Sequence, residues 1–412
     1  MTNRKFYMMG VCGMGMAPLA AFLKDSGADV EGFDHSPNFD VKSALEKCGV
    51  EFAAPHRLDT DRTVVISTAL KRKIGEIRAA TGCGEILRRG ECWAQLCADR
   101  KLTAVVGSHG KSTVSALISH AALKMGLDFG YLVGAVPTDF PMHKYCGTGK
   151  PVVSEIDESD GTIENFSPEI TVALNADLDH TDTYADNLKL AEMFARLFAR
   201  TKKIVLYPKS DKMLARIAAA AQTPSRAVET PPDFNAANRA MAAAALGETF
   251  GIKPQMSVFD DYRGLLRRQE MLLCTPQCSA IADYAHHPNE VKSFLEWFDG
   301  KFDGEKIVVF QPHRYTRTRR FAEDFARILG DFSERAQVCL LPVYAASEPF
   351  DPLGESTAIA EKSPRIKLVG GAEFFKMVED KLKRSNAGRT SVAIVGAGDF
   401  YFEAKKFFGN IK

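Results

Sequence analysis

Short apolar segments that read as β-strands alternate with segments of helical periodicity along almost the whole chain of 412 residues. The clearest case is an apolar strand at 102–106, which runs into a glycine-rich loop and a helix at 112–125. Parallel strands need a crossover connection, usually a helix, so the alternation predicts parallel sheets covered by helices on both faces. Ligands bind at the carboxyl ends of the strands in such sheets, and we expect the chemistry there.

The alternation falls into three α/β segments, as expected for a chain of this length. We predict a Rossmann-like N-terminal domain at 1–102, a P-loop ATPase-type central domain at 103–254 and a Rossmann-like C-terminal domain at 255–412. The predicted strands lie at 6–11, 29–33, 63–68, 102–106, 152–155, 170–174, 203–207, 280–283, 306–310, 337–341 and 391–395. The predicted helices lie at 16–26, 84–99, 112–125, 186–200, 235–251, 288–299 and 318–330, with further helices before and after the last strand.

Composition limits the partners of the chain. The 53 Lys and Arg residues nearly balance the 52 Asp and Glu residues, so no bulk attraction to nucleic acid or to an anionic membrane is expected. The N-terminal apolar run is interrupted by glycines and lacks a cleavage motif, which predicts a cytoplasmic protein without a membrane span. Nine cysteines without a C-x-x-C pair suit reduced thiols better than a disulfide framework.

The loop "GSHGKST" at 107–113 resembles a phosphate-binding loop that is too short. The usual signature G-x-x-x-x-G-K-[ST] would need a glycine at Val105. The loop nevertheless follows an apolar strand and opens a helix, where backbone amides and Lys111 would bind phosphates and the hydroxyl of Ser112 would bind Mg²⁺. The alternative is a glycine turn with an incidental lysine.

Two further strand ends are rich in acidic residues. The strand at 152–155 runs directly into "EIDESD", and the next strand ends in "NADLDHTDTY", which contains Asn175 and His180. Carboxylates at these positions suit a nucleotide-bound Mg²⁺, which prefers hard oxygen ligands. A solvated acidic loop is the alternative.

The third segment places basic and histidine side chains after its strands. "DYAHHPNEV" contains His286 and His287, and "QPHRYTRTRR" contains His313, Arg314 and Arg317. Two arginines just past a strand suit bidentate binding of a carboxylate or phosphate. A surface basic run is the alternative.

The N-terminal segment begins with a strand, a glycine turn and a helix. Its glycines at positions 10, 13 and 15 do not fit G-x-G-x-x-G, so a dinucleotide site is only weakly indicated. The diphosphate of a nucleotide at the start of this helix is the interpretation we favour, because amides and the helix dipole attract anions there. A turn needed only for tight packing is the alternative.

Together these motifs resemble the Mur ligases of peptidoglycan synthesis. "GSHGKST", "SEIDESD", "NADLDHTDTY", "NAANRAMAA", "DYAHHPNEV", "FQPHRYTRT" and "LLPVYAASE" occur in the order expected of that family, over nearly all of the chain. "DYAHHP" and "PHRYTRT" are typical of the branch that attaches to muramate. The shortened phosphate loop is the ordinary ATP-binding form in this family.

The resemblance implies a role for individual residues. It assigns Lys111, His180, His286 and Arg314 to catalysis, and Ser112, Glu155 and His180 to the metal. It assigns UDP-N-acetylmuramate binding to Gly10, Gly13, Gly15, Met16, Asp34 and Ser67, and amino-acid binding to Tyr284, His286, Arg314 and Arg317. It assigns ATP binding to Gly107, Ser108, His109, Gly110, Lys111, Ser112, Thr113, Asn235 and Asn238.

The implied activity is an ATP- and Mg²⁺-dependent amide ligase that joins L-alanine to UDP-N-acetylmuramate through an acyl phosphate. The chain departs from the family at Ala282, where one of two paired aspartates is expected, and has little room between Tyr207 and Asn235 for the usual extra strands. Two alternatives are a muramate ligase that uses a preformed peptide or another amino acid, and a degenerate nucleotide-binding protein without ligase turnover. A nicotinamide-dependent dehydrogenase would leave the phosphate loop and the acidic clusters unexplained.

Overall fold

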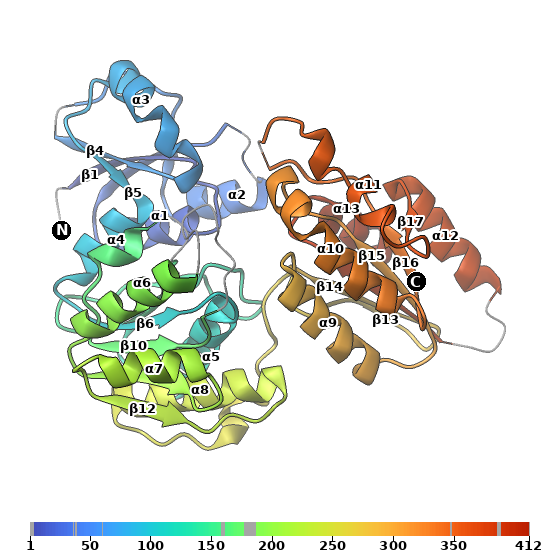
Figure 1. The fold of residues 1–412 in the computed structure, drawn as a ribbon. Helices are drawn as coiled ribbons and strands as arrows, with labels where there is room; N and C mark the ends of the chain where they lie inside the picture. The colour runs from blue at the N-terminus through green and yellow to red at the C-terminus, as the bar shows by residue number, and fades with distance from the viewer. Residues whose placement is uncertain are drawn as a thin grey trace. The chain divides into compact units, whose positions relative to one another are not determined.

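The computed structural model describes residues 4–35, 37, 39–59, 61–157, 161–176, 187–346, 348–384 and 389–411. Within these residues the chain forms three β-sheets, each with its own helices (Figure 1). The chain divides into two compact units, Met1–Arg263 with two of the sheets and Gly264–Lys412 with the third. The predicted α/β fold class is therefore confirmed, whereas the expected boundaries at 102 and 254 stay predictions.

The N-terminal sheet has the strand order β3-β2-β1-β4-β5, and all of its strands are parallel. Side chains alternate across β1, so that Phe6 and Met8 pack on one core and Tyr7 and Met9 on another. The first core includes α1 and α4, and the second includes α3. The elements are β1 (Lys5–Met9), α1 (Met16–Asp25), β2 (Asp29–Phe33), α2 (Phe39–Lys47), β3 (Glu51–Phe52), β4 (Arg62–Ile66), η1 (Thr68–Lys73), α3 (Ile74–Thr81), β5 (Ile86–Arg88) and α4 (Arg89–Cys97).

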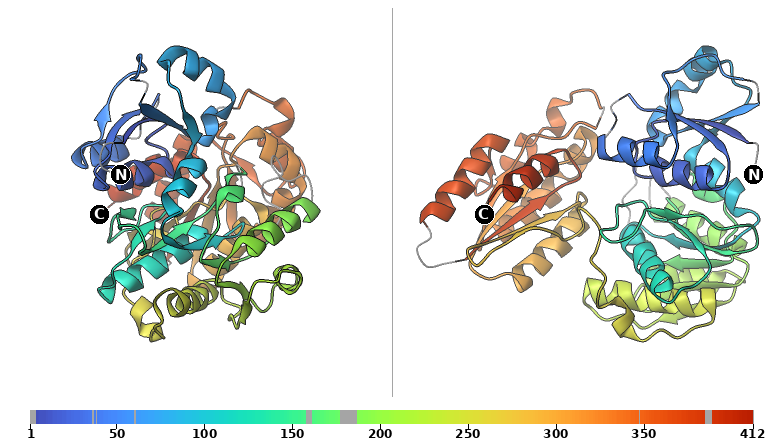
Figure 2. Two further views of the ribbon diagram at one scale, coloured as in Figure 1. Left: turned by 90° about the vertical axis from the view of Figure 1, so that its left-hand side faces the viewer. Right: turned by 180° about the vertical axis from the view of Figure 1, so that it is seen from behind.

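The central sheet has the order β12-β11-β10-β6-β9-β7-β8 and is parallel except for its edge strand β8. Helices α5 and α8 cover one face, and α6 and α7 cover the other (Figure 2). The elements are β6 (Lys101–Val106), α5 (Lys111–Lys124), β7 (Gly130–Leu132), β8 (His143–Lys144), β9 (Pro151–Glu155), η2 (Thr162–Asn165), β10 (Ile170–Ala173), α6 (Asn187–Arg200), β11 (Ile204–Pro208), α7 (Lys212–Ala220), β12 (Ser225–Val228), α8 (Phe234–Phe250) and η3 (Met256–Phe259).

The C-terminal sheet has the order β13-β14-β18-β15-β16-β17 and is parallel except for its edge strand β13. One core lies under α9 and α10, and the other lies under α12 and α13 on the opposite face. The elements are β13 (Glu270–Cys274), β14 (Cys278–Asp283), α9 (Pro288–Lys301), β15 (Glu305–Phe310), α10 (Tyr315–Phe332), β16 (Gln337–Leu340), η4 (Pro352–Gly354), α11 (Thr357–Ala360), β17 (Lys367–Leu368), α12 (Gly371–Arg384), β18 (Thr390–Val395) and α13 (Phe400–Gly409).

The structure corrects one predicted element and adds others. The segment 84–99, predicted as a single helix, begins with the three-residue strand β5, which pairs with β4, and only then continues as α4. The antiparallel edge strands β8 and β13 were not predicted, because they are short or irregular. Between Tyr207 and Asn235 the chain holds α7 and the single strand β12.

All nine cysteines are free thiols, and only Cys48 and Cys274 among them are exposed. In the described part of the chain, no helix combines the length and the apolar character needed to cross a membrane.

Candidate functional site

The loop between β6 and α5 wraps around the ammonium group of Lys111. Gly107 and Gly110 have φ angles of +134° and +84°, which residues other than glycine rarely adopt. The Lys111 ammonium donates to the carbonyl oxygens of Gly107 at 2.6 Å and of Ser108 at 3.4 Å. The loop thus presents a positive charge at the start of a helix, which is the arrangement that binds phosphate groups. Ser108, His109, Ser112 and Thr113 complete the predicted loop within the same turn and helix start.

Two asparagines lie beside this loop, and one of them fixes its conformation. The side chain of Asn175, just past β10, accepts a hydrogen bond from the amide of His109 at 2.9 Å and donates to its carbonyl oxygen at 3.0 Å. Asn238 on α8 is 6% exposed, and its Oδ1 lies 3.1 Å from the place that a Cβ on Gly110 would take. The Nδ2 atom of Asn238 has no hydrogen-bond partner among the described residues. A buried amide without a partner costs free energy, so this nitrogen is a candidate for ligand contact.

Asn175 was not predicted as a site residue, although it was noted at a strand end. Its partner lies 66 residues earlier in the chain. Asn235, the other asparagine predicted to contact ATP, lies in the first turn of α8. The roles of Asn235 and Asn238 toward ATP stay predictions.

A carboxylate lies beside the phosphate loop. The hydroxyl of Ser112 donates to Oε2 of Glu155, at the end of β9, at 2.5 Å. Burial raises the pKa of the Glu155 carboxyl, while the hydrogen bond from Ser112 and the positive charges of Lys111 and Arg89 oppose this rise. A hydroxyl and a buried carboxylate beside a phosphate loop are hard oxygen donors of the kind that Mg²⁺ binds, and these residues therefore fit the ion.

Gly134 makes room for this carboxylate. A Cβ at position 134 would overlap Oε1 of Glu155 and would lie 2.7 Å from its Cδ.

His180, which was predicted to serve the metal, lies outside the described residues. Among the described residues, no three His, Cys, Asp or Glu side chains gather closely enough to hold a metal ion. Mg²⁺ usually keeps several waters and uses one or two carboxylates plus substrate phosphates.

The predicted sugar-nucleotide residues meet at the carboxyl ends of β1, β2 and β4. Gly10 has a φ angle of +77°, and a Cβ there would lie 2.6 Å from Oγ of Ser67. Asp34 accepts a hydrogen bond from the amide of Cys12 at 3.0 Å and so fixes the glycine turn.

The rest of the turn leads into α1. The amide of Gly13 donates to the Gly10 carbonyl oxygen at 3.1 Å, and Gly15 is the N-cap of α1. The Met16 side chain is buried in the core. The structure therefore brings the predicted residues together, while their role in binding stays a prediction.

In the C-terminal unit, a histidine and arginine cluster lies at the carboxyl ends of β14 and β15. The rings of His286 and His313 are 5.8 Å apart, and those of Tyr284 and His286 are 5.4 Å apart. Nη1 of Arg317 donates to Nδ1 of His313 at 3.4 Å. Burial, together with the nearby positive charges of His286, Arg317 and Arg314, lowers the pKa of His313 to about 2. His313 is therefore neutral at working pH and accepts the hydrogen bond that orients Arg317.

Arg314 holds an unusual backbone conformation at the N-cap of α10. Its φ angle is +72°, a left-handed value that is rare outside glycine. The amide of Arg314 donates to the Tyr344 carbonyl oxygen at 2.8 Å, and its own carbonyl oxygen accepts from the Thr318 hydroxyl at 2.8 Å. Such conformations cost about 1–3 kcal/mol and gather at functional sites.

Of the two residues directly before the cluster, Asp283 positions it and Ala282 does not. Asp283, at the end of β14, accepts hydrogen bonds from the amides of Ala285 at 2.8 Å and Gln269 at 2.9 Å, and burial raises its pKa to about 6. Ala282 faces the opposite, apolar core under α12 and α13, so the alanine in place of an expected aspartate suits its surroundings.

Arg267 is a further residue of this site that the sequence did not predict. Its guanidinium donates to the carbonyl oxygens of Gly396 at 3.1 Å and Gly398 at 2.6 Å and lies 4.7 Å from the ring centre of Tyr284. It therefore links the loop after β18 to the cluster after β14. The local signal, two adjacent arginines in "LLRRQE", does not reveal these distant partners.

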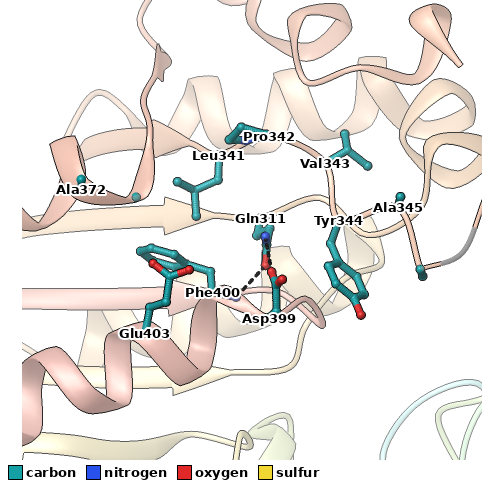
Figure 3. Close-up of a pocket in the computed structure, with 12 residues that line it drawn as sticks. Gln311, Leu341, Pro342, Val343, Tyr344, Ala345, Ala372, Asp399, Phe400 and Glu403 are labelled. Carbon is teal, nitrogen blue, oxygen red and sulfur yellow. Dashed lines mark hydrogen bonds between the residues drawn. The ribbon is translucent and has the colours of Figure 1, made fainter. Parts of the chain in front are cut away.

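A pocket of 520 Å³ adjoins this cluster (Figure 3). Gln311 supports its wall, because its side chain donates to Asp399 at 3.0 Å and accepts from the amide of Phe400 at 3.1 Å. Tyr344 lines the pocket, and its ring centre is 5.5 Å from that of His313. Glu403 and Asp399 give the pocket two carboxylates. The sequence did not predict it, because its walls come from four separate segments.

The two parts of the first unit match family models. Residues 5–101 match the model described as "Mur ligase family, catalytic domain", and residues 105–251 match the "Mur ligase middle domain". The chain belongs to the Mur ligase family. The family expected from the sequence motifs is thereby confirmed.

Mur ligases of known name are similar over most of the chain. A UDP-N-acetylmuramate–L-alanine ligase from Gloeobacter violaceus is 30% identical over 424 residues, covering 93% of this chain and 90% of that protein. A ligase of the same name from Carboxydothermus hydrogenoformans is 29% identical over 452 residues, covering 98% and 96%.

Solved Mur ligase structures share the fold. The UDP-N-acetylmuramate-alanine ligase from Thermotoga maritima has a TM-score of 0.76 at 21% identity and covers 98% of both chains. A murein peptide ligase from Psychrobacter arcticus has a TM-score of 0.70 at 18% identity and covers 100% of both chains. This chain therefore has the three-domain Mur ligase fold.

Proposed function

We propose that this Mur ligase joins L-alanine to UDP-N-acetylmuramate with the consumption of ATP. The observation that carries the proposal is the 30% identity, over 93% of the chain, to a protein named UDP-N-acetylmuramate–L-alanine ligase. The phosphate loop and its neighbouring carboxylate support the use of ATP. A cytoplasmic location, expected from the sequence, stays a prediction.

The residues of the first unit suit phosphoryl transfer. A carboxylate is a poor electrophile, so the muramate carboxylate is first converted by ATP to an acyl phosphate. Lys111 and the loop amides would bind the phosphates and neutralise the charge that develops during transfer. Ser112 and Glu155 would hold a Mg²⁺ ion, which supplies further neutralisation when it is bound. Asn175 keeps the loop amides in place through its two hydrogen bonds to His109.

The residues of the C-terminal unit suit the amine substrate. We propose that Arg317, oriented by neutral His313, and Arg314 bind the carboxylate of L-alanine, since a guanidinium fits a carboxylate with two parallel hydrogen bonds. The amine then attacks the acyl phosphate, forms the amide bond and expels phosphate. His286 is proposed to orient the amine or to accept its proton. Binding of ATP phosphates by the two arginines is the alternative assignment.

Phosphate release tests the proposal. The full chain is assayed with UDP-N-acetylmuramate, ATP and Mg²⁺, and with L-alanine, another amino acid or a free tripeptide as the amine substrate. We expect release that requires all components and is fastest with L-alanine. Release with a peptide but not with L-alanine would favour a peptide ligase. A folded chain that binds ATP and releases no phosphate with any amine would indicate a protein without ligase turnover.

A further inference from the structure

The start of helix α4 packs closely on the central sheet. A Cβ on Gly90 would overlap Oγ1 of Thr162 in η2. Three residues later, the indole of Trp93 donates a hydrogen bond at 3.0 Å to the hydroxyl of Ser154, the residue before Glu155. These contacts fix the backbone of α4 against the strand that carries the proposed metal carboxylate.

The side chain of Arg89 reaches from this fixed position to the glycine turn. Its Nη1 lies 2.9 Å from the place that a Cβ on Gly15 would take, so a side chain at position 15 would displace the guanidinium from the turn. Its Nη2 lies 3.3 Å from Oδ2 of Asp157, and the Arg89 side chain is 20% exposed. Arg89 also lies close enough to Glu155 for its charge to oppose the rise in the pKa of that carboxyl. One guanidinium therefore spans the turn of the N-terminal sheet and the acidic end of β9.

The neighbouring arginine has a different environment. Arg88 is the N-cap of α4, and its guanidinium donates to Oε1 of Glu91 at 2.6 Å and 3.0 Å. The arginine that directly precedes Arg89 thus stabilises the start of helix α4. Arg88 provides a matched control for any substitution of Arg89.

We propose that Arg89 is a further substrate-binding residue, whose guanidinium binds an anionic group of the sugar nucleotide at the glycine turn. This inference rests on the proposed function. A guanidinium is a planar fork that matches a phosphate or a carboxylate with two parallel hydrogen bonds, so its place beside the glycine turn suits an anion of the sugar nucleotide. The substrate offers two such anions, its diphosphate and the muramate carboxylate. An anion bound here lies between the glycine turn and the strand end of Glu155, so Arg89 holds the sugar nucleotide toward the phosphoryl-transfer site.

Calorimetry on the full chain tests the role without turnover. The dissociation constants of UDP-N-acetylmuramate and of UDP-N-acetylglucosamine, which lacks the carboxylate, are measured for wild type, Arg89→Gln and Arg88→Gln. A hydrogen bond to a charged group predicts that Arg89→Gln weakens binding of UDP-N-acetylmuramate by ~10- to 100-fold. The dissociation constants of Arg88→Gln should stay within about twofold of those of wild type, because this substitution lies away from the proposed ligand contact. ATP affinity should be unchanged in both variants.

Each outcome decides a separate point. Equal weakening of both sugar nucleotides assigns the diphosphate to Arg89, and weakening of UDP-N-acetylmuramate alone assigns the carboxylate. A folded Arg89→Gln variant that binds both ligands like wild type overturns the inference and leaves the proposed function intact. Failure of the wild type to bind UDP-N-acetylmuramate contradicts the proposed function and the inference together. If Arg89→Gln does not fold, Arg89→Lys replaces it, since lysine keeps the charge opposite Asp157 but loses the fork.

Discussion

Substitution of Gly134 by alanine tests whether Glu155 must lie where the structure has it. The added Cβ would overlap Oε1 of Glu155 and lie 2.7 Å from its Cδ, whereas carbon atoms in ordinary contact are about 3.5–4.0 Å apart. The carboxylate must therefore move by roughly 1 Å, which breaks the 2.5 Å hydrogen bond with Ser112. A displacement of this size at a catalytic group costs about 100-fold in rate.

The assay is phosphate release from ATP in the presence of UDP-N-acetylmuramate and L-alanine, over a titration of Mg²⁺. We expect Gly134→Ala to lower the maximal rate about 100-fold, or to need a correspondingly higher Mg²⁺ concentration, with about 1–3 kcal/mol of lost stability from overpacking. Gly147→Ala is the matched control, because a Cβ on Gly147 meets no atom within 4 Å. A folded Gly134→Ala protein with the rate and Mg²⁺ dependence of wild type would refute the reasoning.

Three other substitutions test neighbouring assignments. Lys111→Ala should lower turnover by about 100-fold or more without loss of the fold, because a preorganised charge at the phosphates is removed; near-normal turnover would contradict the phosphate-loop assignment. Arg317→Ala should raise the KM for L-alanine by about 30-fold or more, the equivalent of 2–3 kcal/mol, with little change for ATP; a rise for ATP alone would move the amino-acid site elsewhere. Asp283 has a pKa of about 6 in the folded chain and 3.8 as its ordinary value, so wild type loses up to about 3 kcal/mol of stability between pH 4 and pH 7. Asp283→Asn has no ionisable group at this position, so its stability, measured by thermal unfolding at pH 4 and at pH 7, should not show this loss. A wild type that gains stability relative to Asp283→Asn as the pH rises would contradict a raised pKa of the Asp283 carboxyl.

The fold was predictable because its signals are local. Apolar strands of four to six residues, helical periodicity and glycine turns predicted a parallel α/β architecture, and the strand Asp29–Phe33 has the bounds expected from the sequence. The prediction of a single helix at 84–99 was wrong for the first part of that segment. The three residues of β5 become a strand only through pairing with β4, and no pattern within three residues reports such a partner.

The sequence motifs of the site were predictable, whereas the residues that position those motifs were not. The phosphate loop, Glu155 and the cluster around His286 follow strands directly, so their positions at strand ends could be inferred from the sequence. Asn175, Gly134 and Arg267 act on residues that are distant in the chain, and their roles depend on how those segments cross. Asn175 contacts His109, and Arg267 contacts the loop after β18. A single sequence contains no local signal for such contacts.

The burial of the cysteines makes the native chain suitable for site-specific labelling. A maleimide reacts with the thiolate of an accessible cysteine, and burial raises the pKa of the Cys12, Cys278 and Cys339 thiols to about 11. The two exposed thiols, Cys48 and Cys274, fall one in each compact unit. A donor and an acceptor fluorophore at these two positions would report the distance between the units by energy transfer. Any change in this distance on addition of a nucleotide or an amino acid could then be measured in solution without first replacing the other seven cysteines.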